Sequence, residues 1–129
     1  MKIFKEGSCC KMVFGKSKGN KQENKIYRIL KKIDTNTKKS LGSGNSKDEK
    51  GDIMFKNYLI EIKHYKQVTD GLLNKWWRKI AKEARSENRI PILIYKENRR
   101  NEVVVMRMKF KGIPMLISIS FNNWLKIWR

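Results

Sequence analysis

The sequence lacks the features of membrane-embedded and exported proteins. It contains no run of about 18 apolar residues, so we expect no transmembrane helix. Its first residues, MKIFKEGSCCKMVF, have no apolar stretch of the kind that a signal peptide needs. We therefore predict an intracellular, cytoplasmic protein with no membrane partner.

Cysteine and histidine are also scarce. The two cysteines, Cys9 and Cys10, are adjacent, and His64 is the single histidine. Neighbouring cysteines rarely pair with each other, and these three residues cannot supply an ordinary four-ligand zinc site. We expect free thiols in a reducing compartment and a structural rather than catalytic His64.

Acidic residues are few for a chain of this length. There are 12 Asp and Glu against 31 Lys and Arg among 129 residues, which gives a net charge of +19. Such a charge repels itself in a folded chain unless a polyanion is near, so nucleic acid is the leading partner. The hydrophobic fraction of 40% is enough for one domain with a core of its own.

Two polar segments flank the first predicted helix. Residues 1–20 are rich in Lys, Gly and Ser, which indicates a basic flexible arm before a single domain over residues 21–129. Over residues 21–34 the apolar spacing predicts a helix with one apolar stripe, formed by Ile26, Ile29, Leu30 and Ile33. Residues 34–51 are polar and predict a long loop, a kind of segment that is often functional.

The remaining chain alternates between strands and helices. Strands at residues 52–55 and 58–63 are joined by a turn at Lys56-Asn57, and a helix over residues 68–88 begins at Thr69 or Asp70. Further strands and a short terminal helix follow, at residues 89–97, 101–108, 112–120 and 121–129. The run RIPILIYKE is typical of a strand covered on both faces. This order predicts an α/β fold with a mixed β-sheet.

Two acids interrupt the apolar hairpin GDIMFKNYLIEIK, residues 51–63. With a two-residue turn, Asp52 faces Glu61 across the ribbon, and directly opposed residues have Cβ atoms about 4.5–5.5 Å apart. Lys63 is two residues beyond Glu61, so its side chain leaves from the same face. The spacing therefore groups two carboxylates and one ammonium.

Two facing carboxylates repel each other. At about 5 Å and an effective dielectric constant near 20 the repulsion is roughly 3 kcal/mol, whereas a good cross-strand pair contributes about 0.2–1 kcal/mol. Either one acid keeps a proton or a cation lies between them, and oxygen ligands suit Mg²⁺ or Mn²⁺. Such an ion would activate water and polarise a phosphate, with Lys63 stabilising the developing charge. In the alternative, Asp52 only begins the strand and Glu61 pairs with Lys63 or Lys50 at a solvated edge.

Asp52 and the triplet Glu61-Ile62-Lys63 resemble the D…ExK motif of the PD-(D/E)xK nuclease superfamily, with Gly51 where that motif often has Pro. The surrounding order is a basic segment and helix with an early Glu (KGNKQENKIYRIL), a Gly/Ser loop, the hairpin, a helix and the strand IPILIY. It resembles the archaeal-type Holliday junction resolvases, including versions carried by viruses and phages, from about Lys16 to Met106. The resemblance implies a restriction-endonuclease-like fold, a mixed β-sheet flanked by helices.

The resemblance also implies a role for each residue of the motif. Asp52 and Glu61, with the carbonyl of Ile62, would be ligands of Mg²⁺ or Mn²⁺, and Lys63 would be the catalytic lysine. Glu23 matches a glutamate of the family's first helix that completes the metal site, directly or through water. Its alternative role is an interaction with the helix dipole. The family has a serine near the site, and Ser43 is the best match, with Ser40 and Ser46 as alternatives.

Other basic and aromatic residues are candidates for nucleic-acid contacts. We expect lysines of the arm, of the loop and beyond the motif to contact DNA phosphates, namely Lys16, Lys18, Lys21, Lys38, Lys39, Lys47, Lys50 and Lys66. Tryptophans can stack on unpaired bases. At helical spacing, however, we expect core or subunit-interface positions for Trp76, Trp77, Trp124 and Trp128.

The predicted function is a metal-dependent endonuclease that resolves four-way (Holliday) junctions in double-stranded DNA by paired phosphodiester hydrolysis, as a homodimer. Selectivity would come from junction shape rather than from base readout. If a virus encodes the chain, its cytoplasm is that of the infected host cell. Two alternatives stay open: another nuclease of the superfamily, of flap, mismatch or restriction type, and a non-catalytic basic module that binds nucleic acid.

Overall fold

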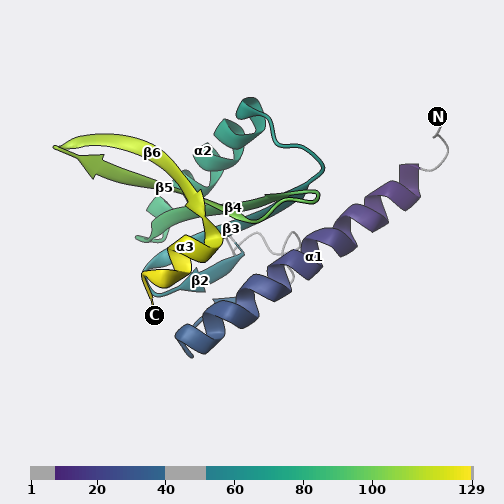
Figure 1. The fold of residues 1–129 in the computed structure, drawn as a ribbon, viewed down its shortest axis with the longest axis horizontal. Helices are drawn as coiled ribbons and strands as arrows, with labels where there is room; N and C mark the ends of the chain where they lie inside the picture. The colour runs from purple at the N-terminus through teal and green to yellow at the C-terminus, as the bar shows by residue number, and fades with distance from the viewer. Residues whose placement is uncertain (1–7, 40–51, 129) are drawn as a thin grey trace.

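A six-stranded sheet lies between helices on its two faces in the computed structural model, which describes residues 8–39 and 52–128 (Figure 1). The helices are α1 (Ser8–Ile33), α2 (Asp70–Ser86) and α3 (Phe121–Lys126). The strands are β1 (Lys38–Lys39), β2 (Ile53–Phe55), β3 (Tyr58–Tyr65), β4 (Ile90–Glu97), β5 (Val103–Phe110) and β6 (Ile113–Ser120). None of the helices described is long and apolar enough to cross a membrane.

The strands follow one another in sequence order across the sheet, from β1 at one edge to β6 at the other. Strands β3 and β4 run parallel, with α2 as the crossover between them, and the other neighbours are antiparallel. The predicted mixed sheet flanked by helices is confirmed. Strand β1 lies in the segment predicted as a loop, because two lysines at a sheet edge show no apolar alternation that would indicate a strand.

Helix α1 covers one face of the sheet with its apolar stripe. Ile26 and Leu30 are fully buried in one cluster with Ile53 and Ile60 of the hairpin. The helix begins at Ser8, upstream of the predicted start at residue 21. The predicted apolar stripe begins at Ile26, and residues 8–20 are rich in Lys, Gly and Ser, so their pattern does not indicate a helix. Residues 8–20 of the predicted arm are therefore helical, and its function as a basic arm stays a prediction.

Helix α2 covers the opposite face. The side chain of Thr69 accepts a hydrogen bond from the N–H of Leu72 at 3.2 Å, which identifies Thr69 as the N-cap. Trp76 and Trp77 are 5% and 6% exposed and pack with Leu59 of β3 and Leu93 of β4. The sequence predicts the tryptophans in the core or at a subunit interface, and the core position is confirmed for these two. Trp124 of α3 is likewise buried, in the cluster on the α1 side, and Trp128 is partly buried against that cluster.

The middle of strand β4 is buried on both faces, as its uninterrupted apolar run predicts. Ile92 and Ile94 belong to the cluster beneath α1, whereas Leu93 belongs to the cluster beneath α2. A strand that contributes to two cores fixes both helices relative to one sheet. The sheet is therefore a rigid support for residues placed at the ends of β2 and β3.

Glu102, just before β5, connects the sheet to α1. Its carboxylate accepts hydrogen bonds from Gln22 Nε2 and from Lys25 Nζ, each at 2.7 Å, and the residue is 8% exposed. Burial by itself raises the pKa of Glu102, but the hydrogen bonds from Lys25 and Gln22 outweigh it and lower the pKa below its ordinary value. The ionised form of Glu102 is therefore favoured by folding.

We predict that Glu102→Gln destabilises the protein by roughly 1–2 kcal/mol at pH 7, because charge-assisted hydrogen bonds are lost. The folded-state pKa of Glu102 is lowered, so this contribution is present above the carboxylate's unfolded pKa of 4.5 and disappears as the pH falls through the folded value. Thermal unfolding of the wild type, of Glu102→Gln and of the control Glu87→Gln measures it. Equal melting temperatures for the two variants at pH 7 would contradict the prediction.

Candidate active site

The β2–β3 hairpin places Asp52 and Glu61 close to each other. The register is the predicted one, with the cross-strand pairs Ile53–Ile60, Met54–Leu59 and Phe55–Tyr58. By strand alternation Asp52 and Glu61 share a face with Met54 and Leu59, which is the face that α2 covers. Asp52 is 9% exposed and Glu61 is 6% exposed. Two acids are thus held largely out of water at one end of the hairpin.

The carboxylate of Asp52 is fixed by the backbone of β3. Pairing in the ladder ends at Ile53, and the N–H of Asp52 donates to the carbonyl of Ile60 at 2.8 Å. The N–H of Ile62, beyond the end of β2, donates to Asp52 Oδ2 at 2.7 Å. The side chain of Asp52 therefore replaces a missing strand partner, and this bond orients its carboxylate toward the middle of the ExK triplet.

Burial raises the pKa of both hairpin acids. Desolvation is the main cause for each, and it raises the pKa of Asp52 to about 6 and that of Glu61 to about 7. The hydrogen bond from Ile62 and the nearby Lys63 lower the pKa of Asp52, while the charge of Asp52 adds to the rise at Glu61. Around neutral pH, ionising both residues at once therefore costs free energy.

Glu23 of α1 lies close enough to the two hairpin acids to interact with them through its charge. It is 7% exposed, and burial is the main cause that raises its pKa. Its Oε1 atom is buried without a hydrogen-bond partner among the described residues, and Lys39 Nζ lies 4.0 Å from it. The charge of Glu23 raises the pKa of Asp52, and Glu61 in turn raises the pKa of Glu23. All three carboxylates therefore interact.

Two lysines balance part of this negative charge. Lys63 Nζ lies 3.6 Å from Glu61 Oε2 and 5.8 Å from the centre of the Trp76 ring. Lys79 of α2 lowers the pKa of both Asp52 and Glu61 through its charge. Lys79 is not among the site residues predicted from the sequence. The pattern of one helix does not indicate which of its exposed lysines approaches a neighbouring strand.

The donor set fits a divalent cation. Carboxylate oxygens are the ligands that Mg²⁺ and Mn²⁺ prefer, and the unpartnered Oε1 of Glu23 is an acceptor that such a cation would satisfy. As the side chains are placed, no three of the described His, Cys, Asp and Glu residues lie close enough together to hold one ion. An ion shared by Glu23, Asp52 and Glu61 therefore requires changes of side-chain rotamer.

The other predicted site residues have different placements. Ser43, Lys47 and Lys50 lie outside the described residues, as do Ser40 and Ser46, and the side chains of Lys16 and Lys18 are not described. Lys21, Lys38 and Lys66 are exposed. Lys39 also donates to Asn24 Oδ1, so it lies at the border of the carboxylate group rather than on an open surface.

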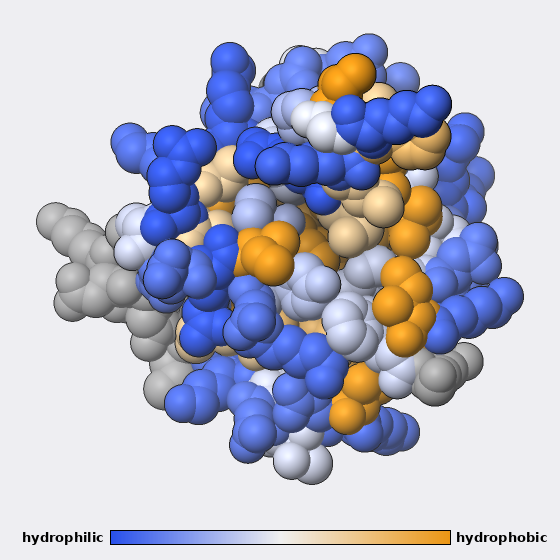
Figure 2. Space-filling view, turned by 90° about the vertical axis from the view of Figure 1, so that its left-hand side faces the viewer, coloured by the Kyte–Doolittle hydropathy of each residue, from blue (hydrophilic) through white to orange (hydrophobic). Residues whose placement is uncertain are grey.

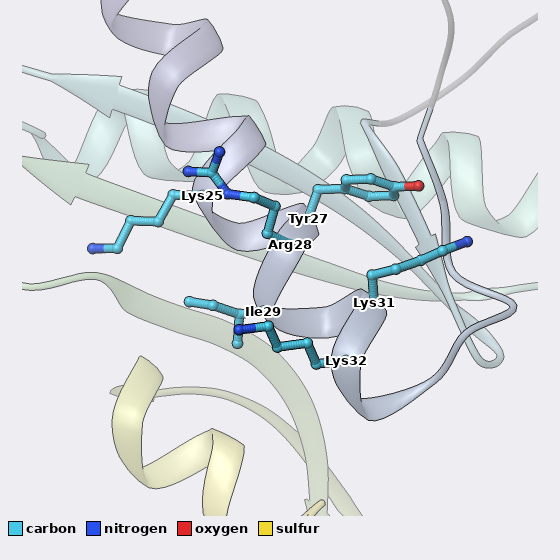
Figure 3. Close-up of a pocket in the computed structure, with 6 residues that line it drawn as sticks. All are labelled: Lys25, Tyr27, Arg28, Ile29, Lys31 and Lys32. Atoms are coloured by element: carbon cyan, nitrogen blue, oxygen red, sulfur yellow. The ribbon is translucent and has the colours of Figure 1, made fainter.

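A basic hollow on α1 lies outside the predicted set. It is lined by Tyr27 and Ile29 and by four cationic residues, Lys25, Arg28, Lys31 and Lys32. Lys25, Arg28 and Lys32 extend on one side of the helix, and Lys31 extends on the other side beside Tyr27 (Figure 3). Cations spaced along a helix suit the repeating negative charge of a phosphate backbone.

Comparisons with known proteins cover most of the chain. A family model described as "Phage putative PDDEXK endonuclease" matches residues 15–122. The solved structure of Archaeoglobus fulgidus Hjc, a Holliday junction resolvase from an archaeal hyperthermophile, is similar over 81% of this chain and 88% of that chain. Its sequence identity is 16% and its TM-score is 0.48, a similarity too low to carry an argument. No curated protein matches the sequence.

The raised pKa values predict that Glu61→Gln stabilises the metal-free protein at pH 8. The folded pKa of Glu61, about 7, lies above its unfolded value of 4.5, so the folded state binds the extra proton and loses stability as the pH rises between these values. The neutral amide avoids this loss. We expect roughly 1–3 kcal/mol of stabilisation at pH 8, declining toward zero near pH 5.

Thermal unfolding in EDTA at a series of pH values measures this difference. The wild type and Glu61→Gln are compared at each pH, so that the titration of all other carboxylates cancels. A variant that is less stable than the wild type at pH 8 would contradict the burial of a charged Glu61.

Proposed function

The chain belongs to the phage PDDEXK endonuclease family, and from this premise we propose that it cuts branched double-stranded DNA and resolves four-way (Holliday) junctions. The observation that carries the proposal is the buried pair Asp52 and Glu61 beside Lys63, in the D…ExK order of the superfamily. Burying two acids is costly for a purely structural purpose, since apolar residues would fill the same space without that cost. The burial of two acids beside a lysine therefore supports a catalytic role.

Each residue of the site has a proposed task. Asp52, Glu61 and the carbonyl of Ile62 would hold Mg²⁺ or Mn²⁺, with Glu23 completing the set. The bound metal would polarise the scissile phosphate and lower the pKa of the attacking water. The hydrogen bond from the N–H of Ile62 keeps Asp52 oriented.

Lys63 would stabilise negative charge on the phosphate. Its ammonium lies 3.6 Å from Glu61 Oε2 and 5.8 Å from the centre of the Trp76 ring, so it stands beside the carboxylates that would hold the metal. Lys79 would add positive charge from α2, since its field reaches both hairpin acids.

The charge of the chain supports a large DNA contact. The net charge of +19 favours a polyanion over a small substrate. The exposed Lys21, Lys38 and Lys66, with Arg28, Lys31 and Lys32 of the α1 hollow, would contact phosphates and read the shape of a branch rather than its bases. Two matched cuts in a junction require two active sites, and we propose that the active form is a homodimer.

We predict that Asp52→Asn and Glu61→Gln lower junction cleavage in Mg²⁺ at least about 100-fold while junction binding persists, because each variant removes a metal-binding charge and no phosphate contact. Asp70→Asn, which changes an exposed carboxylate at the start of α2, is the control and should cleave normally. A labelled four-way junction, a flap and a plain duplex are incubated with Mg²⁺ or EDTA.

Undiminished cleavage by either variant would exclude this active site. Cleavage of the flap or the duplex at the same rate as the junction would exclude resolution as the specific function and leave a less selective nuclease. Binding of the junction without any cleavage in Mg²⁺ or Mn²⁺ would favour the non-catalytic alternative.

A further inference from the structure

Strands β5 and β6 extend beyond the body of the sheet as a two-stranded ribbon. β4 pairs with β5 only through Val103, Val104 and Val105, whereas β5 and β6 pair along their whole length. The ribbon ends in a turn at Lys111 and Gly112, which both have positive φ. It projects from the molecule, at the end remote from the start of α1 (Figure 1). An isolated two-stranded ribbon is marginally stable in water, so this one calls for a covering partner.

One face of the ribbon is apolar throughout. Its cross-strand pairs, from the body outward, are Val104–Ile119, Met106–Ile117, Met108–Met115 and Phe110–Ile113. Val104, Met106 and Ile119 of the first two pairs belong to or pack against the core beneath α1 and α3. The outer two pairs do not, and their residues are 49%, 45%, 64% and 62% exposed in the order named. The hydrophobic core thus continues into solvent as an uncovered strip.

The charges of the ribbon are on its other face. Arg107 and Lys109 alternate with the apolar residues, and Arg107 lies over the ring of Trp77 at 5.8 Å, on the α2 side of the sheet. Lys111 belongs to the turn, with its Nζ 6.0 Å from the centre of the Phe110 ring. Seen from the ribbon's end, apolar side chains stand among a mostly hydrophilic surface (Figure 2).

We propose that the apolar ribbon face, formed by Met108, Phe110, Ile113 and Met115, binds the same face of a second copy of this chain. A surface for DNA should carry cations among its apolar groups, and in this face the alternation of the strands places them on the opposite side. Two chains of charge +19 repel each other, so they can approach closely only where neither presents charge. Apart from Lys111 at the turn, whose Nζ lies 6.0 Å from the centre of the Phe110 ring, the face carries no charge, and it meets that condition.

The self-complementary geometry of a twofold contact suits a single face of this kind. Exposed apolar patches of more than a few hundred Å² on a soluble chain mark interaction sites. In a twofold dimer the same patch serves both copies, so that its area counts twice toward the roughly 1,200–2,000 Å² of a stable interface. The half-buried Met106 and Ile117 would extend the contact toward the body.

This surface deepens the proposed function, because paired cutting of a junction needs two linked active sites. Only the biological purpose of the dimer rests on the proposed function. The dimer itself can be measured without any nuclease assay. The face contains none of the residues proposed for catalysis, so variants of it separate assembly from chemistry.

Sedimentation equilibrium of the full chain in EDTA tests the proposal. The wild type should sediment at twice the 15.4 kDa chain mass. The double variant Phe110→Ser with Ile113→Ser should weaken the dimer at least about tenfold, because four anchoring side chains leave the interface. Both residues are more than 60% exposed in the single chain, so folding should be retained, and far-UV circular dichroism checks it. Met108→Gln provides a second variant if the double variant does not fold.

The matched control is Lys109→Ser, which lies between Met108 and Phe110 but on the charged face. It should remain dimeric. With a supercoiled plasmid that carries a cruciform, the wild type should give linear product and the double variant nicked circles.

Two results would overturn the proposal. They are a monomeric wild type and a double variant that stays dimeric, whether or not that variant keeps its junction binding. A wild-type dimer that depends on Phe110 and Ile113 but cuts no DNA would support the surface and refute the proposed function.

Discussion

The structure buries two acids, Asp52 and Glu61, and keeping them charged out of water costs free energy. The charged and polar groups around the site must offset this cost. Each carboxylate loses hydration on burial, and each feels another acid nearby, so both hold protons at pH values where free carboxylates are ionised. Lys63, Lys79 and the N–H of Ile62 offset only part of this cost. A divalent cation is the simplest partner that would offset the rest, and the unpartnered oxygen of Glu23 points to the same requirement.

The two hydrophobic layers make such an arrangement possible. Apolar clusters on both faces of the sheet, one beneath α1 and α3 and one beneath α2, stabilise β3 and β4 enough to carry an unfavourable group at the end of the hairpin. The hydrogen bonds of Gln22 and Lys25 to Glu102 hold α1 against the start of β5. Glu23 directly follows Gln22 in sequence, so the same bonds help to fix its position. The position of Glu23 therefore follows from contacts that have no catalytic purpose.

Much of this arrangement follows from the sequence, and the exceptions have physical reasons. The register of the hairpin, the Thr69 cap and the doubly buried β4 are local consequences of turn length, capping and apolar patterning, and they are confirmed. Patterning could not predict β1, the start of α1 or the approach of Lys79 and Lys39 to the acids, because these depend on how distant elements pack. Apolar patterning also does not distinguish a buried strand from the outer part of β5 and β6, whose apolar residues are exposed.

Metal uptake coupled to proton release tests the central claim most directly. Isothermal titration of the metal-free protein with Mg²⁺ or Mn²⁺ near pH 6.5, in buffers of different ionisation enthalpy, reports both quantities at once. Because the pKa values of Asp52 and Glu61 are about 6 and about 7, binding should expel protons at this pH, and Glu61→Gln should release fewer. Binding without proton release, or no binding at millimolar metal, would contradict a cation site between these two acids.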